Sequence, residues 1–239
     1  MTLGVVALLS ALVAGAGGLA VPWLIRRLPE PAHSEAAPGE DPKPLYVDVA
    51  ARRGLAVGAA ATSAVLAALV ALVLGTDPWL VAVVPVVPAC VALAVVDWHT
   101  RLLPSRIVLA ATTYAALVAL LLWPLTGDHR DLLRAAIGMV ATWAVYALLW
   151  FVYPVGMGYG DVRLAALIGL VLGHVGWAEL LIGVYSGFLV FGLPGLLLAL
   201  VRWDRKLLKT AFPFGPFMLV GALLGLLLGP WVAAHLGFG

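Results

Sequence analysis

The sequence predicts an all-α polytopic membrane protein with about eight transmembrane helices. Of its 239 residues, 64% are hydrophobic and only 11% are charged, whereas a soluble domain has about 25% charged residues. Apolar runs recur along the chain, and most reach the roughly 20 residues that a helix needs to cross a ~30 Å hydrocarbon core. The runs lie at about 3–25, 54–75, 79–96, 107–125, 132–153, 162–176, 177–201 and 215–236.

The run at 162–176 is the shortest and contains three glycines, so a re-entrant segment is the alternative to a crossing. The positive-inside rule favours a crossing. If all the runs cross and the N-terminus lies outside, inside loops hold all but two of the 14 lysines and arginines. The exceptions are Arg130 and Arg134. We therefore expect both termini outside, with the first run retained as a helix because no positive charge precedes it.

The predicted organisation has three parts: residues 1–28 as the first transmembrane helix, 29–53 as a short cytoplasmic loop, and 54–239 as the main transmembrane domain. The loop is too rich in proline and too short to bury a core of its own. A single cysteine, Cys90, excludes an intrachain disulfide and a zinc site of the CxxC type. No basic patch with interleaved aromatic residues indicates a nucleic-acid partner.

Two aspartates lie at the edges of apolar runs, Asp97 at the end of the third and Asp161 at the start of the sixth. A carboxylate in the centre of a membrane helix costs about 2.5–3.5 kcal/mol, so such residues are functional candidates. Helix capping is the alternative for Asp161, which follows Gly158-Tyr159-Gly160. Capping does not explain Asp97, because an acid is disfavoured at a helix C-terminus. Its alternative is an interfacial ion pair with Arg101 or Arg106.

In the predicted topology both aspartates lie on the cytoplasmic side, and together they suggest an acid/base pair. Two neighbouring carboxylates cannot both ionise cheaply, so one holds a proton while the other is charged. The charged member takes a proton from water, which attacks a peptide carbonyl. The protonated member donates a hydrogen bond to the carbonyl oxygen and later assists the leaving amine. This chemistry needs no metal and no cofactor.

Four blocks of the sequence resemble the type IV prepilin peptidases, a family of GxGD intramembrane aspartyl proteases. Gly158-Tyr159-Gly160-Asp161 resembles the GxGD motif, and Asp97 through Leu103-Pro104 resembles the family's other aspartate block. Arg27-Leu28-Pro29 is similar to the end of the family's first helix, and Pro213-Phe214-Gly215 to the loop that opens its last helix. The four blocks occur in order over nearly the whole chain.

The resemblance implies a peptidase in the cytoplasmic (inner) membrane of a bacterium that removes the leader from prepilin or pseudopilin substrates at the cytoplasmic face. Asp97 and Asp161 would be the catalytic pair, and Gly158 and Gly160 would shape the catalytic turn. The peptidase domain would span 54–239, with the lipid bilayer and the substrate's hydrophobic helix as partners. Many members carry a zinc lobe with paired CxxC motifs and also methylate the new pilin N-terminus. The loop 29–53 has no cysteine, so the chain resembles a short form, and the resemblance does not extend to methylation.

A small ion-coupled transporter is the rival from another class, because paired acids and glycine-broken helices also serve ion coupling. Against it, both acids are predicted near one membrane face, and the chain shows no repeated halves. Presenilin-like GxGD proteases are a second alternative. They carry a Pro-Ala-Leu block near the last helices, which this sequence lacks.

Overall fold

The computed structural model describes residues 2–30, 43–127, 129–154, 157–202 and 213–236, with only the backbone described for 193–202. All regular structure in these ranges is helical. Within the described ranges, six helices are long and apolar enough to cross a membrane, and a shorter apolar helix covers Trp177–Gly192. The predicted class, an all-α polytopic membrane protein, is therefore confirmed. The number of crossings and the sides on which the termini lie stay predictions.

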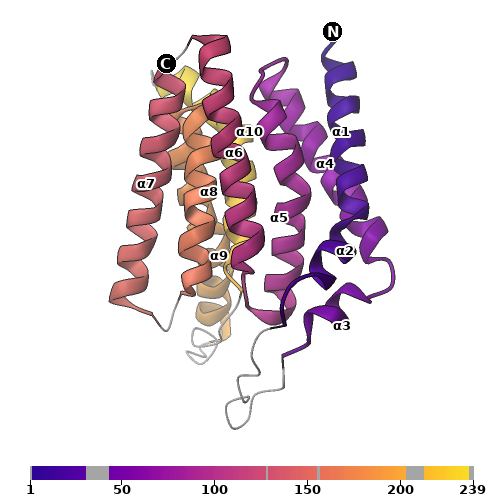
Figure 1. Ribbon diagram of the computed structural model, residues 1–239. Coiled ribbons are helices and arrows are strands. Elements are labelled where there is room, and N and C mark those ends of the chain that lie inside the picture. The colour runs from indigo at the N-terminus through magenta and orange to yellow at the C-terminus, as the bar shows by residue number, and fades with distance from the viewer. Residues whose placement is uncertain (1, 31–42, 128, 155–156, 203–212, 237–239) are drawn as a thin grey trace. The chain divides into compact units, whose positions relative to one another are not determined.

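The chain divides into two compact units, Met1–Ala111 and Thr112–Gly239. The first unit contains α1 (Leu3–Leu19), α2 (Val21–Arg26), α3 (Tyr46–Ala50), α4 (Leu55–Leu74) and α5 (Leu80–Thr100). The second contains α7 (His129–Val152), α8 (Tyr159–Val175), α9 (Trp177–Arg202) and α10 (Gly215–Leu236). Helix α6 (Ser105–Thr126) runs through the boundary between them. Figure 1 shows the course of each helix.

In the first unit, small side chains let α1 lie directly against α4. A Cβ atom added at Gly18 would stand 2.5 Å from Cα of Ala60, so the two backbones touch at this point. Close approach through small residues is the usual way in which membrane helices associate, because lipid offers no hydrophobic driving force between them. The predicted first helix is interrupted at Ala20, just before Pro22, because proline lacks the N–H that would continue the hydrogen-bond ladder.

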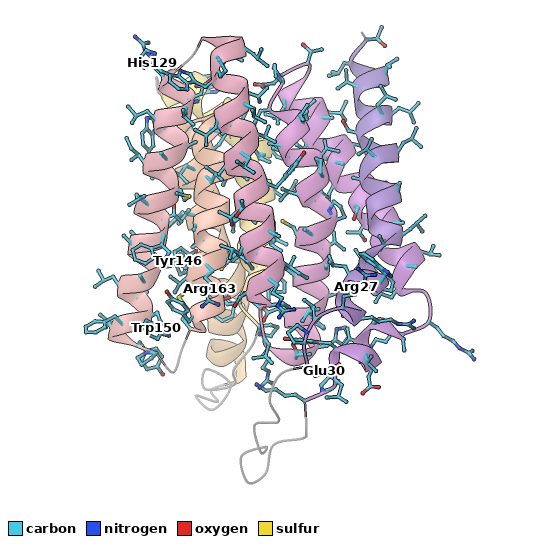
Figure 2. All side chains as sticks on the ribbon, viewed as in Figure 1. Arg27, Glu30, His129, Tyr146, Trp150 and Arg163 are labelled. Carbon is cyan, nitrogen blue, oxygen red and sulfur yellow. The ribbon has the colours of Figure 1, made fainter. Side chains whose placement is uncertain are left out.

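The predicted loop 29–53 contains the short helix α3, and Glu30 fixes the start of that helix. The Glu30 carboxylate accepts hydrogen bonds from the backbone N–H groups of Tyr46 at 2.8 Å and Val47 at 2.9 Å. Burial, and then the charge of Glu30, raise the pKa of the Tyr46 phenol. Helices α2 and α3 both pack against α5, and Figure 2 shows Glu30 at this end of the unit. Residues 31–42 lie outside the described ranges, as do Arg205, Lys206 and Lys209 of the predicted inside charges.

In the second unit, α7 and α8 pack as an antiparallel pair whose register is fixed by glycines. A Cβ atom at Gly138 would stand 2.6 Å from the Gly169 carbonyl oxygen, and one at Gly173 would stand 2.9 Å from the Arg134 carbonyl oxygen. Moving four residues toward the C-terminus of α7 therefore corresponds to moving four residues toward the N-terminus of α8. Helices α9 and α10 form a similar pair, with Gly183 and Gly187 facing Gly221.

Arg134 closes the end of this pair that is remote from Asp161. Its guanidinium donates to the carbonyl oxygens of Gly173 at 2.6 Å, His174, and Val175 at 3.0 Å, which are the last carbonyls of α8. It also forms an ion pair with Asp131. A cation at a helix C-terminus further complements the helix dipole.

We expect Arg134→Met to lower the free energy of unfolding by about 2 kcal/mol, because three part-buried carbonyls lose a charged donor. The measurement is the thermal midpoint of the detergent-solubilised protein. Arg134→Lys is the matched control, and we expect an intermediate loss because a lysine keeps the charge but not the planar fork of donors. Equal midpoints for the wild type and Arg134→Met would show that these bonds contribute nothing net.

Candidate active site

Asp97 lies in the last turn of α5 and is buried, with 4% of its surface exposed. The helix ends one turn later at Arg101, whose backbone is left-handed (φ 56°) and whose N–H donates to the Asp97 carbonyl oxygen at 2.8 Å. Pro85 and Pro88 lie inside α5, which continues through both of them. The aspartate is therefore held on a regular helix, directly before the turn that leads to Leu103-Pro104.

The side chains of His99 and Thr100, which follow Asp97, form hydrogen bonds with the backbone of the last turn of α5. The Thr100 hydroxyl donates to the Val96 carbonyl oxygen at 2.8 Å and accepts from the Leu102 N–H at 3.3 Å. Nδ1 of His99 lies 2.8 Å from the Val95 carbonyl oxygen, and only the protonated nitrogen can donate to it. His99 therefore caps a backbone group of its own helix.

Asp161 lies in the first turn of α8 and is also buried, with 6% of its surface exposed. It is the third residue of the helix, and its Oδ2 accepts a hydrogen bond from the backbone N–H of Gly158 at 3.0 Å. Gly158 itself occupies the cap position in extended conformation (ψ 148°). This arrangement is the carboxylate half of a capping box. The capping interpretation of Asp161 therefore holds in part, because the aspartate supports the turn from inside the helix.

The two glycines of the turn have different surroundings. A Cβ atom at Gly158 would meet Oδ2 of Asp161 at 3.5 Å, an ordinary contact, so the need for glycine here is not steric. Gly158 is exposed and Gly160 half-buried, so the turn leaves the backbone beside Asp161 open to a ligand. Their support of a catalytic turn stays a prediction.

An exposed aromatic and cationic group lies beside this turn. The Tyr159 ring packs on the Trp150 ring, with centroids 5.1 Å apart, and the Arg163 guanidinium lies over the Tyr159 ring at 4.7 Å. Figure 2 shows Trp150 and Arg163 at the same end of α7 and α8. Tyr159, the variable residue of the GxGD motif, therefore positions the guanidinium of Arg163, two residues after the aspartate.

An aromatic cluster lies in the same unit as Asp161, and it was not predicted from the sequence. Tyr146 of α7 has only 1% of its surface exposed, and its ring centroid lies 5.3 Å from that of Phe188 and 6.2 Å from that of Phe214. Phe191 packs edge-on against Phe214, with centroids 4.9 Å apart. Phe214 belongs to the block before the last helix, so the cluster joins that block to α7. The available signal was a tyrosine inside the apolar run 132–153.

The structure thus places the four sequence blocks in two groups. In the first unit, Leu28 is buried after α2, and α2 packs on α5, which carries Asp97. In the second unit, Phe214 packs on Tyr146, and Tyr146 belongs to the helix that pairs with Asp161's α8. Asp97 therefore belongs to the first unit and Asp161 to the second. Among the described residues, no three histidine, cysteine, aspartate or glutamate side chains gather as a metal site.

The family model for the type IV leader peptidase family matches residues 84–200. This segment, just under half of the chain, is similar to the type IV leader peptidase family. The matched segment contains both Asp97 and Asp161, together with most of α5 and all of α6 through α8. The resemblance that the four sequence blocks suggested is therefore confirmed.

Several relatives bear the name prepilin leader peptidase/N-methyltransferase. The protein from Pseudomonas putida is 32% identical over 152 residues, which is 63% of this chain and 50% of the relative. That from Escherichia coli K12 is 29% identical, covering 59% of this chain and 60% of the relative, and that from Bacillus subtilis 168 is 32% identical, covering 58% and 52%. The chain spans about half the length of the curated relatives it matches. No solved structure matches it significantly.

Proposed function

We propose that this chain is an aspartic endopeptidase of the bacterial inner membrane that removes the leader from type IV prepilin-like substrates at the cytoplasmic face. The observation that carries the proposal is the buried Asp161 in the first turn of α8, tied to the backbone of a GxGD turn. A structural cap needs no burial, and a buried carboxylate at the edge of a membrane protein is costly to keep. The matched family segment and the names of the relatives support the substrate class.

In the proposed reaction Asp97 and Asp161 form the catalytic pair. The charged carboxylate removes a proton from a water molecule, and the water oxygen attacks the carbonyl carbon of the scissile peptide. The protonated carboxyl donates its proton to the carbonyl oxygen, which gives a neutral tetrahedral diol. Collapse of the diol breaks the C–N bond: the amine receives the proton that the first carboxylate had taken, and a diol hydroxyl returns a proton to the second carboxylate, which restores the pair. The products are the free leader carboxyl and a new pilin N-terminus.

The test is co-expression of the full chain with each prepilin-like protein of the same genome, followed by mass spectrometry of the substrate's N-terminus. We expect the wild type to generate a new N-terminus directly before the substrate's hydrophobic helix. The double variant Asp97→Asn/Asp161→Asn, present in the membrane at the same level, provides the uncut reference. Substrates that stay intact with the wild type would contradict the proposal and bring the ion-coupled transporter forward.

The same spectra test methylation, which the printed names of the relatives include. Transfer of a methyl group to the new N-terminus would add the mass of one methylene unit. We propose that this chain acts as a peptidase without that second activity, because the loop 29–53 lacks the cysteines of the zinc lobe. A methylated product that depends on this chain would contradict that part of the proposal.

A further inference from the structure

We propose that Tyr146 is the positioning residue of Asp161: its buried hydroxyl donates a hydrogen bond that holds the carboxylate in place and in its charged form. The inference rests on the proposed function and assigns a role to a residue outside the four sequence blocks. It also gives the two carboxyl groups different parts, because Asp161 becomes the member that takes the proton from water.

The register of α7 and α8 places the two residues at the same level. Gly173 faces Arg134, and Gly169 faces Gly138, so residues four apart on one helix match residues four apart on the other in the opposite direction. Continuing this register by two further steps brings Tyr146 opposite Asp161. The contact between the rings of Trp150 and Tyr159, 5.1 Å apart, shows that the pairing continues to the end of the helices.

Both side chains are buried at that level, so neither can rely on water for a hydrogen bond and each needs a partner within the protein. Tyr146 is 1% exposed and Asp161 6% exposed. A buried tyrosine hydroxyl usually finds a hydrogen-bond partner, and the aromatic rings that contact Tyr146, those of Phe188 and Phe214, offer none. The register and the burial of both side chains therefore assign the Asp161 carboxylate as the acceptor of this hydroxyl.

Within the second unit, the other charged or titratable groups at this level leave the assignment intact. On α8 itself, Arg163 is exposed and lies over the Tyr159 ring. From α9 and α10, which also pack on α8, Phe188 and Met218 lie toward this end, and the buried Glu179 lies in the first turn of α9, at the opposite end of α8. In the proposed arrangement the Gly158 N–H and the Tyr146 hydroxyl both donate to Asp161.

Tyr146→Phe removes only the hydroxyl and keeps the ring in its aromatic cluster. We expect kcat for leader removal to fall about 10- to 100-fold with KM unchanged, which corresponds to one lost hydrogen bond to a charged group. The acid limb of the pH–rate profile should move to higher pH, because the charged carboxylate has lost a donor. Tyr185→Phe is the matched control, since Tyr185 lies in the same unit and is 66% exposed.

A measurement that needs no substrate separates this proposal from the proposed function. Infrared spectra of the full chain, recorded across a pH series, contain the carbonyl band of each protonated carboxyl, and the band absent from Asp161→Asn belongs to Asp161. In Tyr146→Phe its midpoint should move to higher pH by about one unit. An unchanged midpoint with active wild type would overturn the role of Tyr146 alone. A shifted midpoint with inactive wild type would support it and refute the peptidase.

Discussion

Asp161→Asn is expected to lower leader removal by at least about 10²–10⁴-fold, the usual contribution of a general acid or base. Asparagine keeps the size of the side chain and an oxygen that accepts the Gly158 N–H bond, which measures 3.0 Å in the structure. It cannot take a proton from water. The capping role and the catalytic role therefore separate in this one variant: if Asp161 were only a cap, Asp161→Asn would retain nearly full activity.

Asp77 offers a control with a purely structural carboxylate. Its Oδ1 accepts from the backbone N–H of Trp79 at 2.7 Å, just before α5 begins. We expect Asp77→Asn to cleave as well as the wild type, and Asp97→Asn to fail as completely as Asp161→Asn. Activity is measured as the initial rate of leader release from a synthetic prepilin, with the amount of enzyme in the membrane matched. Cleavage by either catalytic-site variant at the rate of the control would refute the pair.

Gly169→Ala is expected to destabilise the second unit by about 1–3 kcal/mol, the usual cost of overpacking. The new Cβ atom would collide with the Gly138 carbonyl oxygen and stand 2.8 Å from Oγ1 of Thr142. A backbone carbonyl cannot turn aside as a side chain can, so the two helices must separate. The measurement is the thermal midpoint in detergent, followed by the intrinsic fluorescence of the tryptophans.

Gly58→Ala is the matched control, because a Cβ atom at this helical position of α4 meets no atom within 4 Å. Alanine is the better helix former by about 1 kcal/mol, so this variant should unfold at or slightly above the wild-type temperature. Equal midpoints for Gly169→Ala and the wild type would show that α7 and α8 do not touch at this level. If the midpoint falls as expected, kcat should fall too, because separated helices withdraw Tyr146 from Asp161.

The helices themselves could be predicted because hydropathy is a local property. The apolar runs 107–125, 132–153 and 215–236 correspond to α6, α7 and α10 within a few residues at each end. The run 162–176 is the instructive case, because its helix, α8, begins at Tyr159 and so includes the motif aspartate. The glycines before Asp161 were expected to precede the helix, but a turn of helix needs no apolar residue to begin when a carboxylate binds its first N–H groups.

The identity of the two aspartates as candidates also followed from the sequence alone. A charged residue is conspicuous in an apolar run, because its cost in a membrane makes it rare there without a functional reason. Short structure in the polar loop was harder to foresee. Helix α3 is only five residues long and is fixed by Glu30, which lies 16 residues before the first N–H that it binds.

The sequence by itself thus determined the class of protein, the helical segments and the pair of candidate acids, since each depends on the composition of one short stretch. Only the tertiary structure decided which residues stand beside Asp161. Tyr146 lies on α7 and Asp161 on α8. Nothing in the sequence around Tyr146 distinguishes it from a tyrosine that faces lipid. Its place follows from the contact of Gly138 with Gly169, where two backbones meet because neither carries a side chain.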